Sequence, residues 1–454
     1  MDAIGHDPIE RSDDDRLGRK DFAQLLAKAL AGSPERRSMV VALYGDWGSG
    51  KTSTLNLCFE ALGELPAEAQ PLMVRFNPWW YSNTGELLAQ FFEELGTALE
   101  EQAESKGIGV LKGIKDKLLS YRKLVAPAGA AADLLVSGGA LTVLASLLQA
   151  GAERAAQGQE AAPDVRKIRG EIEAALAEVG RRVVIAIDDI DRLSAPEIRD
   201  VFKVVKATAD FPNTRYLLAF DFGTVTNALS EVQRTDGVAY LEKIVQVPFR
   251  LPDPDPGQLM DIVKDGVREL ASRPELGVPA EDVEHAVERL GSLALYGLGS
   301  LWDNMRRVSR FLDSLRLTLP AVADEVRLSD FVLLEALRVT EPRAYELVLD
   351  GQNLLVGTTP GAEPLFMSPR SGDPQEMANR ATTALVDAVC EAPEREELKV
   401  VIREVLEELF PRAEAARRGA QDTDGATSTS GEATGACAYW SSSGSRRAGA
   451  CRPA

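Results

Sequence analysis

The stretch that most constrains this chain is a glycine-rich turn with the sequence Gly45-Asp46-Trp47-Gly48-Ser49-Gly50-Lys51-Thr52. It stands between an apolar run, Met39–Tyr44, and a run with helical character that begins at Lys51. The spacing of Gly, four residues and Gly-Lys-Thr is that of a phosphate-binding P-loop, which requires a strand before it and a helix after it. An ordinary glycine turn would not need this context, so the sequence predicts a phosphate site here.

Each residue type in this turn has a chemical reason. Glycines let the backbone wind tightly and point its N–H groups at phosphate oxygens, and the start of the helix adds further N–H groups and partial positive charge. Lys51 is expected to reach the β- and γ-phosphates, and Thr52 to place its hydroxyl on Mg²⁺. The candidate nucleotide-binding residues are Gly45, Asp46, Trp47, Gly48, Ser49, Gly50, Lys51, Thr52 and Ser53.

A cluster of acids further along the chain completes this chemistry. Residues 182–187 form a run that is continuously apolar after Arg182, as expected for a strand at the centre of a parallel sheet, and Asp188, Asp189 and Asp191 follow them. Asp188 is expected to hold Mg²⁺ through its water shell, and Asp189 to orient or deprotonate an attacking water. A loop that only caps the next helix would explain one aspartate but not three together. The cluster therefore has the form of a Walker B element.

Further apolar runs at residues 71–76, 215–220 and 245–251 predict additional strands, separated by helical patterns. Five strands with helical crossovers indicate an α/β domain with a parallel sheet. Asp221 stands at the carboxyl end of one of these strands, where a residue that senses the γ-phosphate would lie. Strand-end acids on two strands besides the P-loop favour hydrolysis over simple binding.

For two segments, the aromatic residues after the second strand and residues 15–19, the sequence allows both a structural role and a role at the nucleotide site. Trp79, Trp80 and Tyr81 follow the second strand, either as a hydrophobic plug under a loop or as a platform beside the nucleotide. Residues 15–19 are either a solvated lead-in to a helix or an element that covers the nucleotide base.

Residues 124–151 are rich in Ala, Gly, Leu and Val and carry a single charge, Asp133. Their length approaches that of a membrane span, and basic residues precede them, but Asp133 near the centre would cost about 2.5–3.5 kcal/mol. A buried hairpin and a membrane-associated segment both stay open. The polar N-terminus has no apolar signal core, so we expect a cytoplasmic protein whose association with a membrane is undecided.

After residue 256 the strand patterns end and helical ones continue to residue 410. The predicted division is a polar tail at 1–14, a core at 15–255 with an insertion at 106–163, a helical domain at 256–410 and a disordered or aberrant tail at 411–454. Arg306 and Arg310 share a helix face, which is either a solvated basic face or the source of a sensor arginine. The composition of residues 435–454 suggests an out-of-frame or truncated end.

Charge and rare residues exclude several classes of function. The net charge of −19 opposes bulk attraction to DNA, RNA or anionic lipid, so direct nucleic-acid binding is not indicated. The four cysteines show no paired metal spacing, and two histidines are too few for a His-based metal site or triad.

The motifs together resemble the KAP family of P-loop NTPases. The resemblance rests on residues 15–19, the Trp47-containing P-loop, residues 76–81, residues 187–192, residues 218–221, residues 240–246 and residues 304–312. It implies a five-stranded sheet in the order 5-1-4-3-2, ATP as the nucleotide, Mg²⁺, and Arg306 as a sensor, although the family often has Pro where this chain has Met305. Bacterial relatives are often linked to phage exclusion, and many members carry membrane hairpins where residues 124–151 lie.

The resulting hypothesis is a Mg²⁺-dependent ATPase that acts as a switch or motor on a protein partner, in an anti-phage setting. Lys51, Asp189, Asp221 and Arg306 are its candidate catalytic residues, and Thr52 and Asp188 its metal ligands. A membrane-associated scaffold that binds ATP with little hydrolysis is the first alternative, and a small-molecule kinase is the second. Self-association is also left open.

Overall fold

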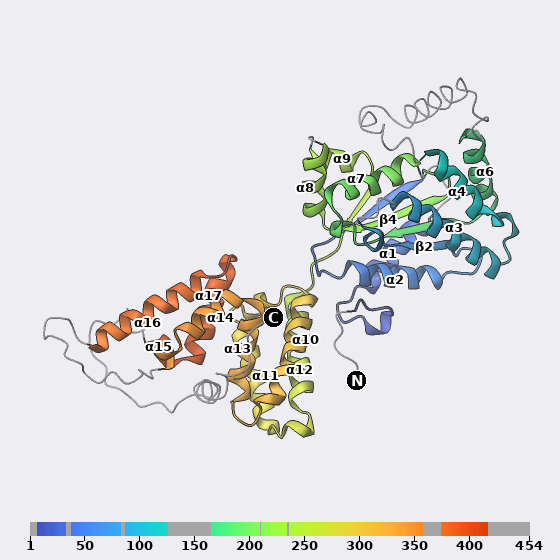
Figure 1. Cartoon of the computed structure of the whole chain (residues 1–454). Helices are drawn as coiled ribbons and strands as arrows, with labels where there is room; N and C mark the ends of the chain where they lie inside the picture. Colours follow the sequence, from blue (N-terminus) through green and yellow to red (C-terminus); the bar gives the residue numbers. More distant parts are fainter. Residues whose placement is uncertain are drawn as a thin grey trace. The chain divides into compact units, whose positions relative to one another are not determined.

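The computed structural model describes residues 7–32, 38–82, 87–125, 165–208, 210–233, 236–356 and 374–415. The chain divides into two compact units (Figure 1). Pro8–Pro252 form the first unit, and Asp253–Ala454, with Met1–Asp7, form the second. The domain boundaries expected from the sequence stay predictions.

The first unit is built on a sheet of five parallel strands. The strands are β1 (Met39–Tyr44), β2 (Leu72–Phe76), β3 (Val183–Ile187), β4 (Thr214–Phe220) and β5 (Val247–Arg250). Their order across the sheet is β2-β3-β4-β1-β5. This confirms the α/β class and the predicted order 5-1-4-3-2, read from the opposite edge.

Helices cover both faces of this sheet (Figure 1). Alternate side chains of β1 point to opposite faces, so Val40 and Ala42 join one core while Val41 and Leu43 join the other. The second of these cores includes α1 (Lys20–Ala31) and α2 (Lys51–Gly63). The first includes α3 (Leu87–Ser105), α4 (Ile114–Val125), α6 (Val165–Glu178), α7 (Ala195–Lys203) and α8 (Phe222–Gln233), and α9 (Gly237–Glu242) leads toward β5.

The register of the strands brings the predicted functional residues to one edge of the sheet. Phe76 pairs with Ile187, and Tyr44 pairs with Phe220, each at the end of its strand. The residues that follow these four positions are Asn77, Asp188, Gly45 and Asp221. Because the strands are parallel, these residues emerge on the same side, where ligands of such sheets bind.

The described part of the predicted insertion packs into the core. Leu111, Ile114, Leu118 and Tyr121 are all buried against the sheet-covering helices. Of the basic residues in this region, Lys115 and Lys117 contact acidic partners, Glu93 at 3.9 Å and Glu171 at 3.7 Å. No helix within the described ranges has the length and apolarity needed to span a bilayer. Most of the 124–151 segment, including Asp133, lies outside the described residues.

The described residues of the second unit contain helices and turns without a strand. The helices are α10 (Pro256–Ala271), α11 (Ala280–Ala294), α12 (Met305–Thr318), α13 (Leu328–Thr340), α14 (Pro342–Asp350), α15 (Gln352–Val356), α16 (Pro374–Glu391) and α17 (Glu396–Leu409). The helical pattern that the sequence predicts up to residue 410 is divided between α13 and α14 and between α16 and α17. Pro342 and Pro393 lie at or beside the breaks, because proline cannot donate to the preceding turn. Residues 411–415 are helical, whereas 416–454 lie outside the described residues.

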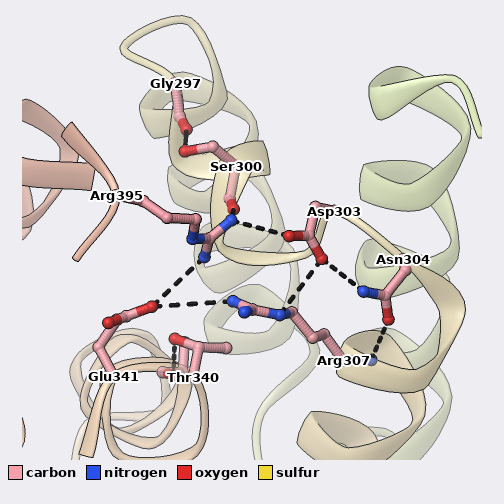
Figure 2. A network of polar contacts seen from close by, with 9 residues as sticks. Gly297, Ser300, Asp303, Asn304, Arg307, Thr340, Glu341 and Arg395 are labelled. Carbon is pink, nitrogen blue, oxygen red and sulfur yellow. Dashed lines mark hydrogen bonds and ion pairs between the residues drawn. The ribbon is translucent and has the colours of Figure 1, made fainter. Parts of the chain in front are cut away.

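A network of charged side chains joins α12, the α13–α14 junction and the start of α17 in this helical unit (Figure 2). Arg395, before α17, donates to Asp303 at 2.8 Å, to the carbonyl of Ser300 at 3.0 Å and to Glu341 at 3.3 Å. Arg307 on α12 pairs with the same two acids, at 3.2 Å from Asp303 and 3.7 Å from Glu341. The network ties the first turn of α12 to the α13–α14 junction and to the start of α17.

Candidate nucleotide-binding site

The turn between β1 and α2 has the backbone that its glycines predict. Gly48 and Gly50 adopt φ values of 85° and 94°, which disfavour any side chain, and Gly50 directly precedes the first turn of α2. A Cβ atom at Gly45 would stand 2.6 Å from Ser49 Oγ. Ser49 Oγ is itself buried and has no hydrogen-bond partner among the described residues. The turn therefore holds an orphaned hydroxyl beside the free N–H groups of a helix start, as an anion site would.

Lys51 lies within this turn and is only 8% exposed. Its ammonium group donates to the carbonyls of Gly45, at 2.9 Å, and Asp46, at 3.3 Å. The Nζ atom also stands 3.6 Å from Oδ2 of Asp191, which is equally buried. The cation thus lies against the loop that would surround a phosphate, with a carboxylate as its counterion.

Thr52 and Asp188 meet although they are distant in sequence. The Thr52 hydroxyl donates to Asp188 Oδ2 at 2.7 Å, and the backbone N–H of Asp189 donates to Asp188 Oδ1 at 2.8 Å. The residue Asp188 as a whole is half-buried. Burial raises the pKa of Asp188, and the hydrogen bond from Thr52 opposes part of that rise.

Asp189 combines an unusual backbone with two strong side-chain contacts. Its φ of 56° places it in the left-handed region, which costs a non-glycine residue roughly 1 kcal/mol and is found preferentially at functional sites. Its Oδ2 accepts a hydrogen bond from Asn77 Nδ2 at 2.8 Å, and its Oδ1 lies 2.8 Å from Nε of Arg192. Both oxygens of this carboxylate are therefore oriented by neighbours.

The three aromatic residues after β2 differ in their burial and contacts. The ring of Tyr81 stacks on Phe76, with centroids 5.9 Å apart, and its hydroxyl donates to Glu94 at 2.7 Å. Trp79 and Trp80, in contrast, are 46% and 73% exposed, so they are not part of a plug. The guanidinium of Arg192 lies 5.0 Å from the centroid of the Trp79 ring. Trp47 in the P-loop is 66% exposed.

Several predicted residues have structural contacts of their own. Asp221 Oδ1 accepts from the N–H of Thr224 at 2.7 Å, which caps α8. Ser53 Oγ accepts from the N–H of Ile9 at 3.3 Å. Asp15 accepts from the N–H groups of Leu17 and Lys20, so the 15–19 segment does form a lead-in to α1. The nucleotide and sensor roles of these residues stay predictions.

Arg306 lies in the first turn of α12 in the helical unit, two residues after Asn304, whose side chain caps that helix. Its assignment as a sensor depends on its distance from the nucleotide and stays a prediction.

The residues present fit a magnesium ion. Thr52 and Asp188 offer two hard oxygen ligands 2.7 Å apart, next to the phosphate loop. Mg²⁺ in nucleotide sites takes few ligands from the protein and completes its shell with phosphates and water. Across the described ranges, no three Asp, Glu, His or Cys side chains gather as a metal site.

The contacts of Asn77, Arg192 and Asp191 were not expected from the sequence. Asn77 stands directly after a strand, and a polar side chain at the carboxyl end of a strand was the available signal. In the sequence, Arg192 and Asp191 stand out only as members of the charged stretch after residue 187. Their partners depend on the path of the chain from β3 into the short helix at Ile190–Arg192.

The parallel sheet, the glycine turn and the acids after β3 define a P-loop nucleotide-binding domain. The family described as "KAP family P-loop domain" matches residues 19–322, and the chain belongs to this family. The chain is 27% identical over 353 residues to the phage T7 exclusion protein of Escherichia coli strain K12. That alignment covers 74% of this chain and 46% of the relative, so the chain spans about half of that protein's length.

Among solved structures, the chain is similar to the ORC2 protein of Aeropyrum pernix in its ADPNP–ADP complexes, with 12% identity and a TM-score of 0.37. That match covers 89% of this chain and 97% of the other. A RuvB mutant of Thermotoga maritima matches with 13% identity and a TM-score of 0.31, covering 90% and 94% of the two chains.

Proposed function

We propose that this protein is a Mg²⁺-dependent ATPase that works as a molecular switch or motor. The observation that carries the proposal is the meeting of Thr52 and Asp188 at 2.7 Å, with Lys51 and Asp189 beside them in the chain. Two motifs separated by more than a hundred residues thus supply a phosphate-binding cation, a pair of metal ligands and a candidate base at one edge of the sheet. The family membership supports a nucleotide as the ligand.

The roles of the residues follow from their chemistry. Lys51 would exchange its contacts with the loop carbonyls for phosphate oxygens, because an ammonium donates three hydrogen bonds and a phosphate offers stronger acceptors. Thr52 and Asp188 would hold Mg²⁺, which when bound neutralises charge on the β- and γ-phosphates. Asp189 would orient a water and accept its proton as the water oxygen bonds to the γ-phosphorus and the bond to the bridging oxygen breaks.

Asp221 and Arg306 would then report the state of the γ-phosphate to the helical unit. Asp221 caps α8, so a shift in its carboxylate would move the start of that helix. Arg306 belongs to the first turn of α12, which the network of Figure 2 holds firmly. The choice of ATP over GTP rests on the family resemblance.

Phosphate release from the purified full chain tests the proposal. We expect Mg²⁺-dependent release from ATP by the wild type, and loss of about 10²-fold or more in Lys51→Ala and Asp189→Asn. Lys51→Ala is expected to weaken nucleotide binding as well, whereas Asp189→Asn is expected to bind ATP and fail to cleave it. Equal release by all three proteins would refute hydrolysis at this site, and GTP in parallel reactions tests nucleotide choice.

The named relative also supports a biological setting. We infer that this chain acts in exclusion of a phage or another mobile element, coupled to a protein partner. Cells carrying the wild-type gene should form fewer plaques than cells carrying Lys51→Ala or Asp189→Asn. Equal plaque numbers across a panel of phages would count against this setting while leaving the ATPase proposal intact.

A further inference from the structure

Asp189 belongs to a closed ring of contacts that joins the ends of β2 and β3. Asn77 Nδ2 donates to Asp189 Oδ2 at 2.8 Å, and Asn77 Oδ1 accepts from the N–H of Trp79 at 3.0 Å. Arg192 closes the ring, because its Nε lies 2.8 Å from Asp189 Oδ1 and its guanidinium lies over the Trp79 ring. Each of the four residues contacts two others.

The orientation of the Asn77 amide follows from this ring. Its oxygen is occupied by a backbone N–H, so only its nitrogen can face Asp189, and that nitrogen is a donor. A carboxylate at position 77 would face Asp189 with a like charge, and an alanine would leave Oδ2 without its donor. Asparagine is therefore the residue type that this position requires.

The ring leaves the carboxylate able to act on water. An ionised carboxylate has about four lone-pair sites on its two oxygens, and Asn77 and Arg192 each use one. The side chain of Asp189 is 17% exposed, so water can reach it. The backbone of Asp189 is in the left-handed region, and one donor on each carboxylate oxygen fixes the rotation of the side chain.

We propose that Asn77 and Arg192 are positioning residues for the ATPase reaction, which they serve by holding the Asp189 carboxylate in one orientation toward the attacking water. This inference rests on the proposed function and adds the means by which the base is aligned. Misplacement of a reacting group by about 1 Å can cost roughly 10²-fold in rate. Loss of either donor should therefore lower kcat and leave nucleotide binding unchanged, since neither residue belongs to the P-loop.

The experiment compares Asn77→Ala and Arg192→Lys with Tyr81→Phe in the full chain. Tyr81 lies in the same short helix as Trp79, and its hydroxyl bond is similar in length to the Asn77–Asp189 bond, but that bond goes to Glu94, which is not one of the four ring residues. We expect kcat to fall about 10- to 100-fold in Asn77→Ala and less in Arg192→Lys, which keeps the charge. Tyr81→Phe should keep the wild-type kcat, and KM and the thermal midpoint of Asn77→Ala should match those of Tyr81→Phe.

A second comparison separates positioning from a purely structural role. In single-turnover reactions, Asn77→Ala should add no further loss in an Asp189→Asn background, because residues that act as a unit are not additive. Additive losses, or a wild-type kcat in Asn77→Ala beside an active wild type, would overturn the inference alone. A wild type no more active than Asp189→Asn would instead overturn the proposed function, and the inference with it.

Discussion

Replacing Thr52 with valine removes one hydroxyl and keeps the shape of the side chain. In the structure this hydroxyl donates to Asp188 Oδ2 at 2.7 Å, and no other donor to that oxygen is found among the described residues. A hydrogen bond to a charged group contributes roughly 1.5–3 kcal/mol, so the free energy of unfolding of the P-loop unit should fall by about 2 kcal/mol where Asp188 is ionised. For a unit of this size, that corresponds to a decrease of roughly 4–8 °C in the thermal midpoint.

The cost of this substitution should depend on pH in a defined direction. Burial raises the pKa of Asp188 above its ordinary value of 3.8, so the folded chain binds this proton more tightly than the unfolded chain does. The contribution of Asp188 to the free energy of unfolding therefore decreases as pH rises through its folded pKa. The Thr52 bond opposes the rise, so the pKa of Asp188 should be higher still in the variant. The difference between variant and wild type should be small below the folded pKa of Asp188, where the carboxyl group is protonated, and largest above it, where the group is ionised.

Thr54→Val is the matched control, because Thr54 lies on the same helix and donates to the neutral carbonyl of Gly50 at 3.0 Å. Its cost should be about 0.5–1.5 kcal/mol and independent of pH. Hydrogen exchange of α2 peptides between about pH 5 and pH 8 measures both variants within the P-loop unit alone. If both substitutions lower the free energy of opening of α2 by the same amount at every pH, the Thr52–Asp188 hydrogen bond has no charged component.

Three further predictions concern the metal ligand Asp188, the P-loop glycine Gly45 and the network around Arg395. Calorimetric titration of ATP with and without Mg²⁺ should show metal-enhanced affinity in the wild type and none in Asp188→Asn; enhancement retained in the variant would remove Asp188 from the metal site. Gly45→Ala should weaken nucleotide affinity about tenfold or more, because the new Cβ would displace Ser49 Oγ into the phosphate cradle, and unchanged affinity would contradict that crowding. Arg395→Met should destabilise the helical unit by about 1–3 kcal/mol, since it breaks contacts to Asp303 and Glu341 that are only partly exposed; hydrogen exchange of α12 and α17 peptides measures this.

The strands could be predicted because each is a short, mostly apolar run bounded by turn residues, even where an arginine interrupts it, as Arg75 does in β2. β3 and β4 are buried at every position, which is the pattern that central strands of a parallel sheet require. The observed bounds differ from the predicted ones by one or two residues at most. The helices of the second unit could be predicted less accurately. The apolar periodicity continues across Pro342, so it does not indicate the break between α13 and α14. The residue before a proline is biased away from the helical region, and at Glu341 that local rule outweighed the apolar pattern.

The P-loop and Asp188 could be located from sequence because their chemistry is local and their spacing is specific. The partner of Asp189 could not, because Asn77 is 112 residues away and reaches it only through the register of β2 against β3. That register places Phe76 beside Ile187, and hence Asn77 beside the acids, but no pattern in either segment encodes it. A local reading would, however, have found the cap at Asp221, which stands three residues before Thr224 at the start of a helix.

The existing contacts of Lys51 and Asp188 lower the net free energy that nucleotide binding can gain at this site. Lys51 already donates hydrogen bonds to two loop carbonyls and lies near Asp191. The free energy of phosphate binding therefore contains only the difference between the new contacts of Lys51 and the contacts that it gives up. The same holds for Asp188, whose bond from Thr52 would be exchanged for a shared metal ion. Asp189 differs from both, because its two donors come from outside the P-loop and need not be displaced when phosphate binds. A site of this kind can therefore bind and release nucleotide at modest net cost while the group that acts on water stays aligned.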